Sequence, residues 1–137
     1  MIRQIVRDVD FLSQKSVPAT RADMPIIRDL IDTLYANREH CVGMAANMIG
    51  ELKTILIARL SGEAVIMVNP VITDRSAQSY EVQEGCLSLL GTRPTTRSKV
   101  ITVEYLDRKF KKRRMILRDL EAQIVQHEMD HFEGKII

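Results

Sequence analysis

The chain has 137 residues, enough for one domain with its own apolar core and too few for two domains of ordinary size, so we expect residues 1–137 to form a single domain. An apolar fraction of 45% and a charged fraction of 28% are ordinary for a globular protein, and a net charge of only +2 argues against a dedicated nucleic-acid binder. No segment has the apolar length of a signal peptide or a membrane span, which favours a cytoplasmic protein that does not bind membranes.

The first regular element that the sequence predicts is a helix over residues 24–38. Asp23 is a suitable N-cap, and Pro25 falls in the first turn, where its missing N–H is not needed. Apolar side chains then recur at helical spacing, which predicts an amphipathic helix with one buried face: Ile26, Ile27, Leu30, Ile31, Leu34 and Tyr35.

Short segments that are either apolar or alternating predict β-strands. Asn69-Pro70 is expected to end one of them, and residues 91–94 are predicted to form a loop because they combine glycine with proline. The predicted strands lie at residues 52–58, 64–68, 79–82, 100–105 and 110–116.

A second helix is predicted from about residue 120 to residue 132, with Asp119 as its cap and Gly134 at its end. Strands and helices do not alternate along the chain. The sequence therefore predicts an α+β fold, in which short antiparallel strands pack around a C-terminal metal-binding helix, with one N-terminal helix.

The late helix contains the sequence His127-Glu128-Met129-Asp130-His131. Residues four apart share one helical face, so His127 and His131 can bind a single metal ion. Glu128 lies to the side, within reach of a water on that ion, which is the arrangement of a metal-dependent hydrolase. The alternative is a solvated polar helix face that matches the pattern by chance.

A catalytic site of this kind takes three protein ligands and keeps one position open. The third ligand could be a carboxylate or a cysteine. Cys86 is a candidate because Gly85 beside it would let the backbone approach the ion. Taken alone, a cysteine in this apolar setting is more often a small core residue.

Three segments together resemble the peptide deformylase family. Residues 84–88 are similar to the family motif E-G-C-L-S, and residues 126–131 to the motif Q-H-E-x-D-H. Residues 41–48 resemble a third motif, G-x-G-L-A-A-x-Q. The first two motifs are intact, and both hold metal ligands in the family, so the resemblance is specific.

The resemblance implies a metal-dependent hydrolase that removes the N-formyl group from the initiator methionine of new bacterial proteins and releases formate. It implies one divalent ion, usually Fe(II), with zinc, nickel or cobalt as substitutes. Carried over to this sequence, the ligands are Cys86, His127 and His131, and Glu128 moves a proton from the attacking water to the leaving amine. N-formylmethionyl peptides are the implied substrates, and the ribosome is a candidate partner.

The resemblance also implies an oxyanion site formed by the backbone N–H of Leu87 and by a glutamine amide. The glutamine position is Met48 in this chain, and a thioether cannot donate a hydrogen bond. We therefore predict reduced activity. Cys41 and Leu90 also depart from the family pattern, where glycine and proline stand. The implied substrate-binding residues are Gly43, Met44, Ala45, Gly85 and Arg93.

Two other functions stay open. One is a catalytically degenerate homologue that holds the metal and binds peptides without turnover, and the other is a metallopeptidase, since zinc proteases share H-E-x-x-H. A basic run at residues 108–114 could contact ribosomal RNA, although an exposed basic strand face is the more frequent explanation.

Overall fold

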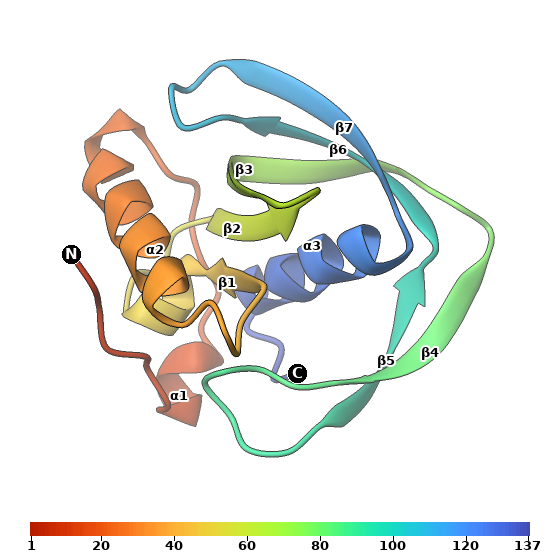
Figure 1. The fold of residues 1–137 in the computed structure, drawn as a ribbon, viewed down its shortest axis with the longest axis horizontal. Coiled ribbons are helices and arrows are strands. Elements are labelled where there is room, and N and C mark those ends of the chain that lie inside the picture. Colours follow the sequence, from red (N-terminus) through yellow and green to blue (C-terminus); the bar gives the residue numbers. More distant parts are fainter.

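The computed structural model describes residues 1–137 and confirms the α+β fold with antiparallel strands and a C-terminal helix (Figure 1). No helix combines the length and the apolar character that crossing a bilayer requires. In chain order, the elements are α1 (Val9–Leu12), α2 (Met24–Ala36), β1 (Gly43–Ala45), β2 (Ile55–Leu60), β3 (Glu63–Arg75), β4 (Ser79–Glu84), β5 (Arg93–Ser98), β6 (Val100–Leu106), β7 (Lys112–Arg118) and α3 (Asp119–Phe132), with short 3₁₀ helices at Arg21–Asp23 (η1) and Ala46–Ile49 (η2).

The strands form two antiparallel sheets with α3 between them. Five strands pair in the order β1-β2-β3-β6-β7, and β4 pairs only with β5 (Figure 1). Strand β2 is buried on both faces, because Ile55 and Ile57 belong to the core cluster beneath α2, whereas Leu56 and Ala58 belong to the cluster beneath α3. The two-residue period of the strand thus supplies both helices with an apolar surface.

The prediction that Asn69-Pro70 ends a strand was wrong, because β3 continues to Arg75. The ladder with β6 is irregular between Val68 and Val71, and Asn69 adopts a left-handed φ of 50° at that point. The Asn69 side chain bonds both the N–H and the carbonyl of Ala19, at 2.8 and 3.0 Å. A bulge tied to the N-terminal segment therefore absorbs the proline without ending the strand.

Residues 91–94 were predicted to be a loop, but β5 begins at Arg93 and pairs with β4. The four-residue helix α1 was not predicted. Helix α2 ends at Ala36 instead of residue 38. The Asp23 side chain accepts the N–H of Thr20, the N-cap of η1, and does not cap α2. Asp119 is the first residue of α3, not its cap.

Replacing Gly134 by alanine should destabilise the fold more than the same change at Gly62. Both glycines have left-handed φ angles, 75° and 83°, but an added Cβ at Gly134 would lie 2.2 Å from the Ser13 carbonyl oxygen, whereas Gly62 faces open space. We expect a loss of about 1 kcal/mol at Gly62 from backbone strain and of roughly 3 kcal/mol at Gly134, where the clash is added. Denaturant unfolding measures both, and equal losses would contradict the prediction.

Candidate metal centre

Helix α3 directs His127, Glu128 and His131 into the interior, and all three are buried. The ring nitrogens Nε2 of His127 and His131 lie 3.1 Å apart, because the residues are one helical turn apart on one face. The Sγ atom of Cys86 joins them, and the three potential ligand atoms all lie within 4.8 Å of one another. This is the one group of histidine, cysteine and carboxylate side chains in the chain that could hold a metal ion.

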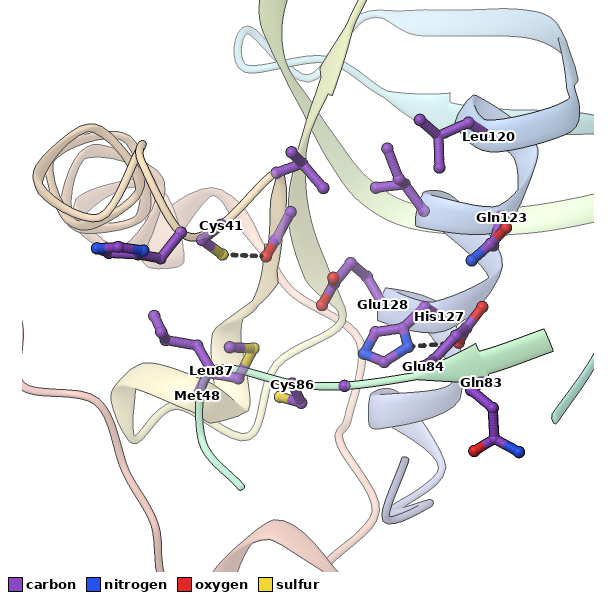
Figure 2. Close-up of a pocket in the computed structure, with 15 residues that line it drawn as sticks. Cys41, Met48, Gln83, Glu84, Cys86, Leu87, Leu120, Gln123, His127 and Glu128 are labelled. Carbon is purple, nitrogen blue, oxygen red and sulfur yellow. Dashed lines mark hydrogen bonds and ion pairs between the residues drawn. The ribbon is translucent and has the colours of Figure 1, made fainter. Parts of the chain in front are cut away.

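Cys86 reaches this position because β4 ends two residues earlier and the chain leaves the ribbon there (Figure 2). A Cβ added to the intervening Gly85 would lie 3.3 Å from the Gly91 carbonyl oxygen, which is closer than side chains usually pack. The absence of a side chain at residue 85 thus allows the close turn that aims the thiol at the helix.

Glu84, the last residue of β4, holds His127 in place. Its Oε1 atom lies 2.6 Å from Nδ1 of His127 (Figure 2), so the imidazole presents Nε2 toward Cys86 and His131. Arg97 on β5 donates to both Glu84 oxygens, with the shortest contact at 2.6 Å, and its Nη1 donates to Asp130 on α3 at 2.5 Å. One arginine and one carboxylate therefore join β4, β5 and α3.

Sequence reasoning assigned no function to Glu84 or Arg97. The place of Glu84 at the head of the E-G-C-L-S segment was an available signal, whereas Arg97 lies in no motif. Gln126 directly precedes the potential metal ligand His127 in the sequence. Its side chain instead bonds the backbone of Ser98, donating to the carbonyl and accepting the N–H, both at 2.9 Å.

The ionisation of these groups follows from burial and from their partners. Burial opposes ionisation of Glu84, but hydrogen bonds from His127 and Arg97 outweigh it and lower the pKa of Glu84 to about 2. Burial would lower the pKa of His127, yet the hydrogen bonds with Cys86 and Glu84 raise it to about 10. Burial and the neighbouring His127 charge lower the pKa of His131 to about 4. At neutral pH, His127 is thus a positively charged imidazolium, and His131 is neutral.

Glu128 is a buried carboxyl group without a hydrogen-bond partner on Oε1. Burial raises its pKa to about 7, which suits a group that both accepts and donates a proton near neutral pH. The carboxyl packs against Gly43 on β1, where an added Cβ would lie 3.0 Å from Glu128 Oε2 and 2.9 Å from Ile124 Cγ2. Glycine at residue 43 therefore leaves the space that Glu128 occupies.

Met48 and Asn47 are neighbours in η2, but their side chains have different surroundings. Met48 lines the same pocket as Cys86 and Glu128 (Figure 2), and its Sδ accepts the N–H of Ala45 at 3.4 Å. Asn47 does not line the pocket, and its amide donates to the His131 carbonyl at 3.3 Å. Asn47 therefore does not replace a missing amide donor at Met48.

Cys41 also lines the pocket, and its thiol donates to the Gly43 carbonyl at 2.8 Å (Figure 2). Burial and the nearby Glu128 raise the pKa of the Cys41 thiol to about 12, so it stays neutral. Cys41 does not adopt a left-handed backbone conformation, so the position does not require glycine.

The pocket over these groups has a volume of about 250 Å³ and includes Gly43, Gly85 and Leu87 in its walls. Three other residues expected to bind substrate do not line it. Met44 and Ala45 are fully buried in the two core clusters, and Arg93 on β5 donates to the Leu90 carbonyl at 3.3 Å. Their side chains therefore do not form the walls of this pocket.

Comparison with known proteins agrees with this geometry. Residues 2–137 match the family model described as polypeptide deformylase. The chain belongs to the polypeptide deformylase family. A peptide deformylase of Clostridium beijerinckii is 56% identical over 137 residues, covering all of both chains. One of Nitrosococcus oceani is 33% identical over 132 residues, covering 91% of this chain and 77% of the relative.

Solved deformylase structures share the fold. The enzyme of Legionella pneumophila superposes with a TM-score of 0.89 at 32% identity, over 99% of this chain and 83% of that chain. The enzyme of Ehrlichia chaffeensis gives a TM-score of 0.90 at 28% identity, over 99% and 86%. Family membership and the Cys86, His127 and His131 group together indicate a divalent metal site.

Replacing Glu84 by glutamine should weaken metal binding about 10- to 100-fold, because it removes the charge that orients His127 and pairs with Arg97. Titration against a chromophoric chelator measures the affinity. Glu81→Gln, the same change at an exposed position of β4, is the matched control. Equal affinities of the two variants would contradict the prediction.

Metal uptake should release the His127 proton. Its pKa of about 10 keeps the imidazole protonated at neutral pH, and its Nε2 must be deprotonated to bind an ion. Protons compete with the metal for His127. Below pH 10, each increase of one pH unit should therefore raise the metal affinity about tenfold through this group alone. Calorimetry in buffers of different ionisation enthalpy counts the protons. Glu84→Gln removes one cause of the raised pKa and should release fewer, and an unchanged count would contradict this account.

Proposed function

We propose that this chain removes the N-formyl group from the N-terminal formyl-methionine of nascent peptides, in a metal-dependent hydrolysis that releases formate. The observation that carries the proposal is the meeting of one thiol and two imidazoles beside Glu128, a buried carboxyl without a hydrogen-bond partner on Oε1. A purely structural metal site uses four protein ligands and has no need of such a carboxyl. Membership of the deformylase family supplies the substrate class.

We infer that Cys86, His127 and His131 are the metal ligands. One sulfur and two imidazole nitrogens suit Fe(II), zinc, nickel or cobalt, and we take Fe(II) as the native ion. When bound, such an ion polarises the formyl carbonyl and lowers the pKa of water. Glu84 fixes the His127 tautomer, since its carboxylate accepts a hydrogen bond from Nδ1–H and leaves Nε2 free to bind.

Glu128 is the proton carrier of the reaction. With a pKa of about 7, its carboxylate accepts a proton from the attacking water, and the resulting acid donates it to the amine that leaves. The bond that breaks is the amide between the formyl carbon and the methionine nitrogen. Formate and a free N-terminal amine are the products, and Glu128 returns to its starting state.

The oxyanion that forms during attack is stabilised by the backbone N–H of Leu87. Leu87 lines the pocket directly after Cys86 (Figure 2). Met48 occupies the place of a second donor, but its sulfur accepts the Ala45 N–H and has no proton to give. We therefore propose that the chain is active with a lower kcat than a family member with glutamine.

The pocket walls suit a methionine side chain. Val42, Leu120 and Ile124 contribute aliphatic groups beside Gly43 and Gly85, whose missing side chains leave room for a peptide backbone. A flexible thioether packs well against such a surface. We propose N-formylmethionyl peptides as substrates, the ribosome as the place where the chain meets them, the cytoplasm as the compartment, and residues 1–137 as one functional domain.

A second candidate function is a metal-holding homologue that binds peptides without turnover. Met48 is the observation that favours it, because the loss of one oxyanion donor typically costs about 10²- to 10³-fold in kcat. The buried Glu128, whose pKa lies near 7, favours turnover instead. A metallopeptidase is disfavoured by family membership.

Formate release from a formyl-Met peptide by the metal-loaded chain tests the proposed function. We expect release faster than with free metal ion, and a loss of about 10²-fold or more in Glu128→Gln with unchanged metal content. Glu133→Gln, at an exposed residue just past α3, is the control and should keep the activity. Peptide binding without formate release would instead support the degenerate homologue.

Replacing Met48 by glutamine should raise kcat by about 10-fold or more, since one oxyanion donor is worth about 10²- to 10³-fold when it is well placed. Met48→Leu is the matched control, because it keeps an apolar side chain of similar volume and should leave kcat low. KM should change little in both variants. A kcat for the glutamine variant no higher than for the leucine variant would contradict the role given to this position.

A further inference from the structure

The turn between β6 and β7 gathers much of the positive charge of the chain. Residues 108–114 read Arg-Lys-Phe-Lys-Lys-Arg-Arg, with six basic side chains in seven residues, and all six are exposed. The whole chain has 20 basic and 18 acidic residues, so the remainder carries net negative charge. The small net charge of the chain therefore conceals a strongly basic hairpin.

This basic turn is held in one conformation. Asp107 accepts the backbone N–H groups of Lys109 and Lys111 at 2.8 and 3.0 Å and the Arg113 Nε at 2.9 Å. These bonds lower the pKa of Asp107 to about 2, so it stays ionised. Phe110 is half-buried against the core cluster beneath α2, and the Arg21 guanidinium lies 5.2 Å from its ring centre. With its aromatic residue anchored, the turn directs its lysines outward.

Strand β7 continues the positive charge in a regular row. Lys112 and Arg114 alternate with Arg113, so they project from the same face with a spacing of about 7 Å. Glu104 is the cross-strand neighbour of Arg114 but forms no ion pair with it. Among the six basic side chains, only Arg113 has an ion-pair partner, Asp107. Five unpaired cations are thus held on a fixed scaffold at the free edge of the sheet.

We propose that residues 108–114 form a docking surface for the phosphate backbone of duplex RNA. Lysine and arginine neutralise phosphates and gain affinity by releasing counterions. Single-stranded RNA would need exposed aromatic side chains for base stacking, and Phe110, the aromatic residue of the turn, is packed inward. An anionic membrane also attracts basic clusters, but stable attachment takes an additional apolar anchor, and the turn presents no exposed apolar side chain.

The choice of RNA over DNA rests on the proposed function, because an enzyme of nascent chains works beside RNA. The basic turn and the loop between β4 and β5 that carries Cys86 lie at opposite ends of the molecule (Figure 1). Residues 108–114 do not line the metal pocket. RNA bound at the turn would therefore leave the pocket open to a peptide.

The test is fluorescence anisotropy with a blunt duplex RNA of about 20 base pairs between 50 and 200 mM NaCl. We expect the affinity to fall with salt at a log–log slope of about −4.5, as five contacts at about −0.9 each would give. The variant Lys111→Gln/Lys112→Gln/Arg114→Gln should bind at least tenfold more weakly, with a slope shallower by about 3. Arg28→Gln/Arg59→Gln/Lys99→Gln removes equal charge from other exposed positions and should bind within about twofold of the parent chain.

Several outcomes would overturn the proposal. They are equal weakening in both triple variants, a salt-independent affinity, tighter binding of single-stranded RNA of the same length, or binding of duplex DNA at least tenfold tighter than RNA. Aggregation of the first variant with unchanged RNA affinity would mean that the lysines only protect the sheet edge. Formate release is measured on the same samples, so loss of activity with intact RNA binding would count against the proposed function alone.

Discussion

The bond between Glu84 and His127 is the interaction on which the candidate centre depends. It joins the end of a strand to the middle of a helix, and its carboxylate is fixed in turn by Arg97. Replacing any one partner leaves a buried charge uncompensated, which is more costly than never having formed the pair. The network therefore sets the position of the helix against the β4–β5 ribbon, and with it the distance between Cys86 and the two imidazoles.

Space is the second constraint, and glycine provides it. Gly43 lets the Glu128 carboxyl lie against the edge strand, and Gly85 lets the chain turn so that Cys86 faces the helix. The same burial that keeps Glu128 away from solvent raises its pKa into the range useful for proton transfer. The close packing of Glu128 and its raised pKa thus both follow from the way the backbone surrounds this one carboxyl group.

The helical metal motif could be predicted because its signal is local: two histidines one turn apart must share a face. Strand β5 was missed because Arg93–Ser98 is rich in arginine and threonine and has little apolar content, so its pairing with β4 decides its structure. Strand β3 continues past Asn69, whose side chain bonds Ala19 and Thr54, two residues far from it in the sequence. Arg97 likewise acquires its role from Glu84 and Asp130, which no spacing in the sequence connects.

The fold and the proposed reaction require different hydrogen-bonding groups at residue 48. Its sulfur accepts the Ala45 N–H at the start of η2, so the 3₁₀ turn keeps a side-chain partner for its backbone. The turn thus needs only an acceptor at residue 48, which thioether sulfur provides weakly and an amide oxygen would provide better. Stabilisation of the oxyanion needs a donor instead. A methionine there is compatible with the fold and with the three potential metal ligands. We propose that its only cost falls on the chemical step.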